Sequence, residues 1–303
     1  MGFVHHDTAL CCGSFIAAQD ALAYAAPLMF EPLRQIFRSR PRVPDRPPPA
    51  VPAGTRWYAV GDVHGRLDLF EALIEAIERD DAEGTPAQST VVLLGDLVDR
   101  GPDSAGVVAR ARAWQAARPV RLLAGNHEEM FLYALEDIAV LRHFLRHGGR
   151  QTALSYGIPR DAYDRATMEE LQVLLAEALP DEDRRFLLAA KNYLVAGDYL
   201  FVHAGIEPGV ALDRQEERHL RWIREPFLEH PEHHDHFVVH GHTITEGLDA
   251  RHNRIGIDTG AYRSGCLTAL VLEGIKRRVI QAVERDGAIT IEHSTCEAGA
   301  SAR

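Results

Sequence analysis

The chain has 303 residues, with 33 basic and 44 acidic side chains and a formal net charge of −11. Its content of 46% hydrophobic and 25% charged residues is ordinary for a globular protein and excludes a collagen-like, fully disordered or coiled-coil chain. Non-specific DNA or RNA binding needs clustered Lys and Arg, so the acidic balance argues against a nucleic-acid partner.

The beginning of the chain differs in composition from the rest. Prolines cluster between residues 41 and 52, which predicts an N-terminal extension over residues 1–55 with a disordered Pro-rich arm. A short amphipathic basic segment begins at Met29, and our hypothesis is that Met29 is the physiological start. The four cysteines include the adjacent Cys11 and Cys12 but no Cys-x-x-C pair, so we expect reduced thiols and a cytoplasmic protein. No apolar run reaches the roughly 20 residues that span a bilayer, so we expect no membrane span.

From residue 56 onward, short apolar runs alternate with helical patterns. The runs at 57–60, 91–94 and 120–124 each end at a glycine, and a helical pattern follows each of them. This alternation predicts βαβ units and a largely parallel sheet. The expected helices lie at 67–78, 104–117, 128–139, 168–179 and 181–190.

The second half of the chain has short apolar or alternating runs with few helices between them. This pattern predicts a second, more antiparallel sheet. The runs lie at 199–203, 237–240, 254–257, 267–272 and 278–283. We therefore expect one folded domain over residues 56–285, followed by a loose C-terminal tail at 286–303.

Short polar motifs follow the expected strands, where open α/β sheets bind their ligands. They are rich in Asp, His, Asn and Arg, and their flanking glycines allow sharp turns, so that several strand ends can converge. The motifs are Gly61-Asp62-Val63-His64-Gly65, Gly95-Asp96-Leu97-Val98-Asp99-Arg100-Gly101, Gly125-Asn126-His127-Glu128, Val202-His203-Ala204-Gly205 and His240-Gly241-His242-Thr243.

This mixture of carboxylate, imidazole and amide oxygen suits divalent metals such as Mn²⁺, Fe²⁺ or Zn²⁺, and no thiolate takes part. Asp62 and His64 alternate along an extended segment and can bind one ion, while Asp96 can bridge to a second. The spacing therefore supports a two-metal site. The second ion can be completed by Asn126, His203 and His242.

The motifs, in this order, resemble the signature of the phosphoprotein phosphatase family of calcineurin-like metallophosphoesterases. Bacterial and phage-lambda-type serine/threonine phosphatases look most similar, and the resemblance covers about residues 56–275. It implies an α/β protein with a four-layer α/β/β/α sandwich of two mixed β-sheets. It also implies two divalent metal ions, with Mn²⁺ as the first expectation and Fe or Zn as alternatives.

The resemblance also implies residue roles. Arg100, together with Arg224 in a Trp-x-Arg segment, matches the clamp on the substrate phosphate. His127 matches the acid that protonates the leaving oxygen, oriented by Asp99, and the implied reaction is direct attack of a metal-bridging hydroxide on phosphorus. The implied metal ligands are Asp62 and His64 for the first ion, Asp96 between the ions, and Asn126, His203 and His242 for the second.

Other polar residues near the motifs are expected outside the ligand set. We interpret Glu128 and Glu129 as first-turn helix residues stabilised by the helix dipole. We interpret Asp258 and Thr259 as residues that support the site from behind. For Tyr262, a place in the lining of the pocket is an alternative that we do not favour. The histidines that we do not expect to bind metal are His233, His234 and His236 in a solvated loop, and His240 next to the ligand His242.

Two enzymatic functions remain open. The resemblance favours a phosphomonoesterase acting on phosphoserine or phosphothreonine, with a phosphoprotein or phosphopeptide as partner. The alternative is a symmetrical dinucleoside polyphosphate (diadenosine tetraphosphate) hydrolase, although such sister hydrolases more often carry Asp at the position of Glu128. A metal-loaded but inactive phosphate-binding scaffold fits less well, because none of the expected functional residues is missing. Metal ions with Arg100 and Arg224 would make the pocket locally positive despite the acidic total.

Overall fold

The computed structural model describes residues 47–296. Residues 1–46 and 297–303 are outside the described residues. Three expectations concern residues outside this range: the start at Met29, the reduced thiols of Cys11 and Cys12, and most of the Pro-rich arm.

The stretch just before the first strand is ordered, which contradicts the expectation of a disordered arm as far as residue 55. Val51 is buried at 3% exposure, and its N–H donates to the Gly274 carbonyl at 3.1 Å. The neighbouring Ala50 N–H donates to the Asp198 carboxylate at 2.9 Å. An apolar side chain among the prolines thus fixes this stretch to the sheets.

Within residues 47–296, six strands form the first sheet. They are β1 (Thr55–Val60), β2 (Gln88–Leu93), β3 (Val120–Leu122), β9 (Cys266–Glu273), β10 (Lys276–Arg285) and β11 (Ala288–Thr295), in the spatial order β11-β10-β9-β1-β2-β3. The first three pair in parallel, and β9 pairs antiparallel with β1. The predicted βαβ units are confirmed, because α1 (Leu67–Glu83) and α2 (Ser104–Ala117) connect the parallel strands.

The second sheet has five strands among the described residues, in the order β4-β5-β6-β8-β7. Its central strands β5, β6 and β8 are parallel, so the expected antiparallel character is wrong at its centre. The runs expected at 267–272 and 278–283 belong instead to β9 and β10 of the first sheet. The strands of the second sheet are β4 (Tyr193–Ala196), β5 (Tyr199–Val202), β6 (Phe237–His240), β7 (Asp249–Ala250) and β8 (Arg254–Gly256).

The expected loose tail is also wrong for part of its length. Strand β11 pairs with β10 over residues 288–295. Ile289 and Ile291, two positions apart, pack against the main hydrophobic core, because alternate residues of a strand point to the same face. The polar residue between them, Thr290, faces the other side of this edge strand.

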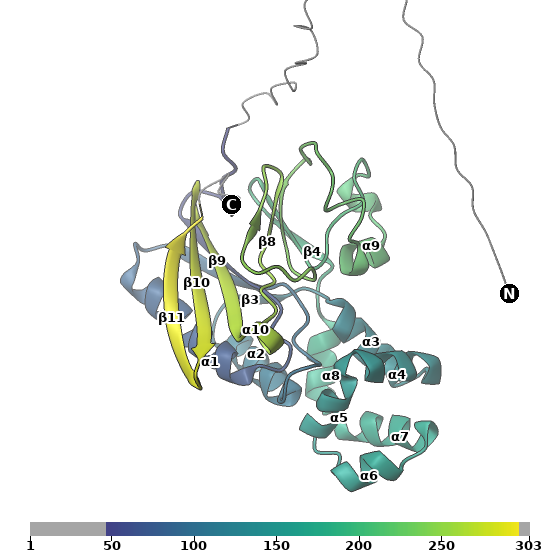
Figure 1. Cartoon of the computed structure of the whole chain (residues 1–303). Coiled ribbons are helices and arrows are strands. Elements are labelled where there is room, and N and C mark those ends of the chain that lie inside the picture. Colours follow the sequence, from purple (N-terminus) through teal and green to yellow (C-terminus); the bar gives the residue numbers. More distant parts are fainter. Residues whose placement is uncertain (1–46, 297–303) are drawn as a thin grey trace, which may run out of the picture. The chain divides into compact units, whose positions relative to one another are not determined.

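Most helices lie between β3 and β4 and project to one side of the sheets (Figure 1). The expected single helix at 128–139 is two helices, since Asp137 caps a new one through the N–H groups of Ala139 and Val140. The helices of this segment are α3 (Asn126–Ala134), α4 (Ile138–Phe144), the π-helical turn η1 (Leu145–Gly149), α5 (Arg150–Ser155), α6 (Arg160–Arg165), α7 (Met168–Ala178) and α8 (Asp181–Leu188).

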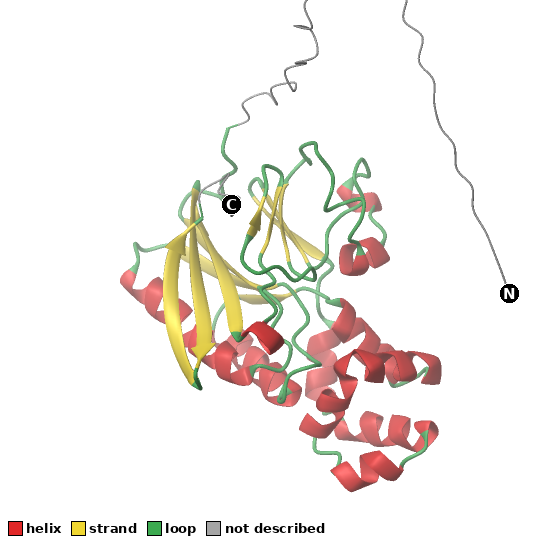
Figure 2. Cartoon of the chain, in the orientation of Figure 1, coloured by secondary structure: helices red, strands yellow, loops and turns green. Residues whose placement is uncertain are grey.

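Among the described residues, buried hydrophobic side chains form three clusters, which fill the spaces between the layers. The largest joins the first sheet to α1 and α2, a second fills the space between the two sheets, and a third lies on the outer face of the second sheet. That outer layer is thin, consisting of η2 (Leu212–Arg214), α9 (Glu217–Trp222) and loops (Figure 2). The structure therefore confirms two mixed sheets with helices in the α/β class. No helix within residues 47–296 is both long and apolar enough to cross a membrane.

Candidate metal centre

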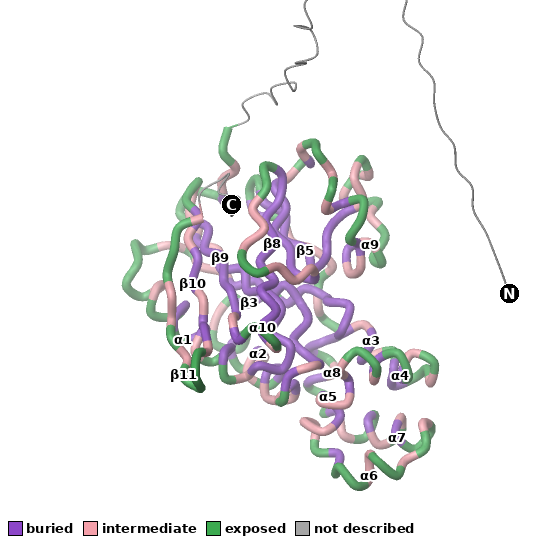
Figure 3. Tube along the Cα trace, viewed as in Figure 1, coloured by how far each residue is buried: buried purple, intermediate pink, exposed green. Residues whose placement is uncertain are grey.

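The polar motifs converge where strands of both sheets end, in loops that are buried (Figure 3). Backbone hydrogen bonds join these loops: His64 N–H donates to the Asp96 carbonyl at 2.9 Å, and Gly241 N–H to the His203 carbonyl at 2.8 Å. Among residues 47–296, six non-glycine residues have positive φ, and five of them belong to the motifs. Such costly backbone conformations gather at functional sites. The five are His64, Asp96, Asp99, Arg100 and His242.

Two groups of side chains in the described part of the chain are close enough to share an ion, and Asp96 belongs to both. One group is His64, Asp96 and His127, and the other is Asp96, His203 and His242, with the potential ligand atoms of each within 4.8 Å of one another. Asp96 Oδ2 lies 3.6 Å from His64 Nε2, and Asp96 Oδ1 lies 3.5 Å from His203 Nε2. The structure thus places Asp96 between the two groups.

The imidazoles of His64 and His203 are held in one tautomer. Their Nδ1–H groups donate to the carbonyls of Val98 at 2.7 Å and Leu94 at 2.8 Å, which leaves each Nε2 facing Asp96. Burial lowers the pKa of His203 and places that of His64 well below its ordinary value. Both rings are therefore neutral and oriented, as metal-binding imidazoles are.

Asn126 and His242 complete the second group. Asn126 Oδ1 lies 2.8 Å from His242 Nδ1 and 3.0 Å from His203 Nε2. Burial, followed by the charge of His203, lowers the pKa of His242 to about 3. The buried His242 Nε2 has no hydrogen-bond partner among the described residues.

Asp62 belongs to neither of these two groups, but it contacts the loop of His242. Its carboxylate accepts the backbone N–H of His242 at 3.1 Å. Gly241 has to be glycine, because a Cβ there would lie 2.1 Å from Asp62 Oδ1. Burial, and then the charges of Asp258 and Asp96, raise the pKa of Asp62 well above its ordinary value.

These residues fit divalent cations. Burial raises the pKa of Asp258 to about 6, and the negative charge of Asp96 adds to that rise. Three buried carboxyl groups, Asp62, Asp96 and Asp258, therefore lie among neutral imidazoles. A bound cation would offset their mutual repulsion and use the lone pairs that face inward.

His127 and Asp99 form a buried pair. His127 Nδ1 lies 2.6 Å from Asp99 Oδ2, and Thr152 Oγ1 donates to Asp99 Oδ1 at 2.6 Å. Burial lowers the pKa of His127, but the carboxylates of Asp96 and Asp99 outweigh it, so that the pKa is raised overall. The pair is therefore suited to holding a proton at His127 Nε2.

The two predicted arginine clamps differ in position. Arg100 reaches into the cluster, with Nη1 2.8 Å from His64 Nε2 and Nη2 2.9 Å from His127 Nε2. Its guanidinium carbon lies 4.9 Å from the ring centroid of Tyr262, which therefore lines the site. Arg224 is exposed and lines a hollow of about 610 Å³ together with Trp222. The structure thus brings Arg100 to the metal ligands and leaves Arg224 at the rim.

The first-turn interpretation of Glu128 and Glu129 is incomplete. Glu128 is 1% exposed, and its carboxylate accepts the N–H groups of Asp96 at 2.8 Å and Leu97 at 2.7 Å, which fixes the Asp96 loop. Glu129 instead accepts the indole N–H of Trp222 at 2.5 Å. Burial, and then the charge of Asp96, raise the pKa of Glu128 to about 7.

Several other residues near the motifs have structural contacts. His240 lies 3.2 Å from Arg254 Nη1 and, as expected, belongs to neither ligand group. Thr259 donates to the Cys266 carbonyl at 2.7 Å, so it supports the strand that follows. Sequence reasoning missed Thr152, because it comes from α5 and no local motif marks it.

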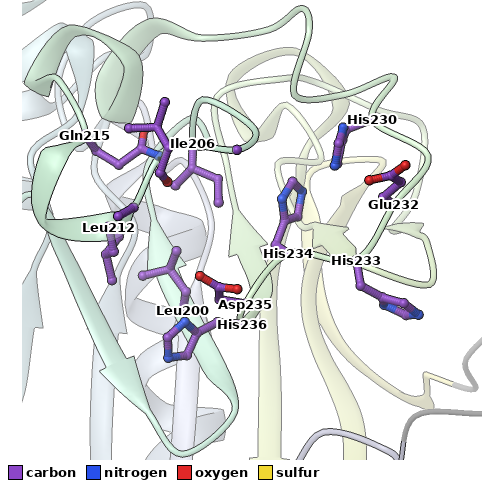
Figure 4. A pocket seen from close by; sticks show the side chains of 13 residues that line it. Leu200, Ile206, Leu212, Gln215, His230, Glu232, His233, His234, Asp235 and His236 are labelled. Atoms are coloured by element: carbon purple, nitrogen blue, oxygen red, sulfur yellow. Dashed lines mark hydrogen bonds between the residues drawn. The ribbon is translucent and has the colours of Figure 1, made fainter.

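The histidine-rich loop lines a separate cavity of about 360 Å³ (Figure 4). The expectation of a solvated loop is wrong for His234, which is buried and stacks on Phe227 with ring centroids 5.5 Å apart. His233, His234 and His236 belong to neither of the possible ligand groups within residues 47–296.

Together, the fold and this cluster define a metallophosphoesterase. A family model described as calcineurin-like phosphoesterase matches residues 55–263, and the chain belongs to that family.

The chain is also similar to individual proteins of known name. The symmetrical bis(5′-nucleosyl)-tetraphosphatase of Acidovorax ebreus (strain TPSY) is 35% identical over 157 residues, which cover 50% of this chain and 44% of that protein. Serine/threonine-protein phosphatase 1 of Salmonella typhimurium is 40% identical over 78 residues, which cover 25% of this chain and 32% of that protein. The solved structure of a cold-active protein-tyrosine phosphatase from a psychrophilic Shewanella species is 19% identical, with a TM-score of 0.46, and the match covers 80% of this chain and 83% of that one. The match spans less than half the length of both curated relatives.

Proposed function

We propose that this protein is a two-metal phosphoesterase whose substrate is a symmetrical dinucleoside polyphosphate, such as diadenosine tetraphosphate. The observation that carries the two-metal chemistry is the position of Asp96, which is shared by two groups of buried potential ligands. The substrate class rests on the longer of the two curated matches, 157 residues against 78. This is the alternative that the motifs left open, and the comparisons support it better than a protein phosphatase.

Two divalent cations, with Mn²⁺ as first choice, would supply Lewis-acid chemistry at this site and would lower the pKa of water towards neutrality. The residues that would hold them are Asp62, His64, Asp96, Asn126, His203 and His242. The remaining functional side chains act on the substrate itself.

Arg100 holds the attacked phosphoryl group through its planar guanidinium, and Arg224 approaches the same group from the rim. His127 Nε2 gives its proton to the leaving oxygen, a contribution typically worth about 10²–10⁴-fold. Asp99 keeps the proton on His127 Nδ1 through the 2.6 Å hydrogen bond, which leaves Nε2 as the atom that faces the substrate.

A second candidate function is a phosphoserine/phosphothreonine phosphatase. The observation that favours it is the contact of Glu128 with the Asp96 loop, because the extra methylene of Glu over Asp lets the carboxylate reach the N–H groups of Asp96 and Leu97. The short match to the Salmonella phosphatase supports the same candidate.

Turnover of both substrates by one Mn²⁺-loaded preparation tests the proposal. We expect diadenosine tetraphosphate to be cleaved with a higher kcat/KM than a phosphoserine or phosphothreonine peptide, and the Asp96→Asn variant to cleave neither. Faster cleavage of the phosphopeptide would replace the first candidate by the second. Cleavage of neither substrate by the wild type would refute both.

A further inference from the structure

A group of exposed basic side chains lies on α4 and η1. Figure 3 shows that much of α4 is exposed. Helical spacing of three and four residues brings them onto one face. None of them forms an ion pair with a carboxylate in residues 47–296, whereas Arg150, just beyond them, pairs with Asp164 at 3.4 Å. We call this group the basic rim, and its members are Arg142, His143, Arg146 and His147.

A chain of ring contacts leads from the basic rim to the metal centre. The imidazoles of His143 and His147 lie 4.1 Å apart, and His143 lies 6.5 Å from Trp222. Trp222 in turn lies 6.5 Å from His242, one of the proposed ligands. The backbone connects the two regions as well, because Arg100 N–H donates to the Gly148 carbonyl at 3.2 Å.

The charges of the basic rim are not compensated within the described residues. Partial burial lowers the pKa of His143, and the nearby charges of His147 and Arg146 lower it further. No carboxylate contributes to this shift. In a chain with a net charge of −11, a surface that keeps several basic groups together without an acidic partner is a place where an anion binds favourably.

More cationic groups lie on the other side of Trp222. The hollow of about 610 Å³ that Trp222 borders is also lined by Arg218 and Arg224. Both arginines are exposed. Glu207 and Glu225 line the same hollow, and Arg218 pairs with Glu216 at 3.9 Å, so in contrast to the basic rim the arginines here have acidic neighbours. A single phosphoryl group at the metal centre does not extend to the basic rim, whereas a linear polyphosphate has further anionic groups that can.

We propose that the basic rim is an outer anion subsite, which binds phosphate groups of a polyphosphate substrate other than the one attacked at the metal centre. This inference rests on the proposed function. Arg146 supplies a planar guanidinium that can bind two phosphate oxygens at once. His147 Nδ1–H donates to the His143 carbonyl at 2.8 Å, so it is Nε2–H of the protonated ring that can donate to a phosphate. The subsite thus selects substrates that carry several phosphates in a row.

Inhibition of p-nitrophenyl phosphate hydrolysis by inorganic tripolyphosphate and by orthophosphate tests the subsite. The test variant combines Arg146→Gln with His147→Asn. In the test variant, the ratio of the tripolyphosphate Ki to the orthophosphate Ki should be about tenfold higher than in the wild type, because the variant loses two partly exposed ionic contacts. The matched control combines Arg160→Gln with Arg165→Gln, which removes two exposed basic groups of α6, and its ratio should stay within twofold of the wild type.

Tripolyphosphate also chelates Mn²⁺, but it does so equally for all three proteins, so only the difference between proteins counts. An unchanged ratio in the test variant, or an equal rise in the control, overturns the subsite. Separate measurement of diadenosine tetraphosphate turnover distinguishes the two proposals. If the wild type does not cleave this dinucleotide but the ratio still rises in the test variant, the substrate proposal fails and the subsite stands. If the dinucleotide is cleaved and the ratio does not change, the subsite fails and the substrate proposal stands.

Discussion

Replacing Glu128 by Gln tests how the loop that carries Asp96 is held. Each carboxylate oxygen of Glu128 accepts a different backbone N–H, with Oε2 2.8 Å from Asp96 N and Oε1 2.7 Å from Leu97 N. Oε2 also accepts the N–H of Gly125 at 3.1 Å. Glutamine has the same length, but one of its terminal atoms is an NH₂ group that cannot accept. In either orientation of the amide, at least one buried N–H donor faces another donor.

The cost follows from the number of N–H groups that lose their acceptor. Each oxygen serves two N–H groups, but the bond from Val98 N to Oε1 is long at 3.4 Å, so the amide is expected to keep its oxygen at the position of Oε2 and to leave Leu97 N–H, with its 2.7 Å bond, unsatisfied. An unsatisfied buried donor costs about 1–3 kcal/mol. For a protein of this size, each kcal/mol lowers Tm by about 2–4 °C. Because the Asp96 loop is then less firmly held, we also expect Mn²⁺ affinity to fall by about 10–100-fold.

Thermal unfolding of the EDTA-treated protein gives the change in Tm, and titration with Mn²⁺ gives the affinity. Glu129→Gln is the matched control, because the neighbouring carboxylate accepts from the side chains of Arg221 and Trp222 and from none of the backbone N–H groups of the Asp96 loop. We expect the control to bind Mn²⁺ as the wild type does, although it loses stability too, because one of its two donors then faces the amide NH₂. The reasoning is refuted if Glu128→Gln binds Mn²⁺ as the wild type does, or if the two variants lose Mn²⁺ affinity alike.

Three further predictions follow from the site and its surroundings. Asp96→Asn should abolish p-nitrophenyl phosphate hydrolysis and lower the metal content measured by elemental analysis, and a fully active variant would contradict the two-metal account. His127→Asn should keep its metal but lose about 10²–10⁴-fold in the turnover of phenyl phosphate. The loss should be smaller with p-nitrophenyl phosphate, because its leaving group needs no proton. Equal losses with the two substrates would exclude an acid role for His127. Burial, and then the nearby charges of His230 and Arg254, lower the pKa of His234 to about 4. The folded protein then binds fewer protons than the unfolded chain, so urea unfolding should show stability falling from about pH 6.5 towards pH 4, and the same acid loss in His234→Gln would contradict this assignment.

The positions of the ligand residues could be predicted from the sequence because each one is marked locally. Asp62 and His64 follow a buried strand within five residues that include two glycines, and the other proposed ligands stand in similar short motifs. Thr152 has no such mark. It lies 53 residues from Asp99 and reaches that carboxylate only because α5 packs there. Contacts that depend on long-range packing of this kind have no local sequence signal.

Strand partners were the least predictable part of the fold. The run in β9 is buried on both faces from Leu267 to Leu272, because β9 lies between β1 and β10. Such a run shows that a strand is central, but it does not show to which sheet the strand belongs. The opposite problem arises at β11, an edge strand with polar residues on one side. Its two isoleucines alternate as a strand requires, yet its overall polarity resembles that of a tail.

The net charge of −11 is compatible with an anionic substrate because the charges are unevenly distributed. Away from the site, acidic and basic side chains neutralise one another, as Asp80 and Arg278 do at 2.5 Å. At the site, the Arg100 guanidinium instead faces imidazoles, with Nη1 2.8 Å from His64 Nε2 and Nη2 2.9 Å from His127 Nε2. A divalent cation would compete with this guanidinium for the lone pair of His64 and would release it toward a phosphoryl oxygen, a stronger acceptor. Such a cation would therefore couple metal loading to phosphate binding through Arg100.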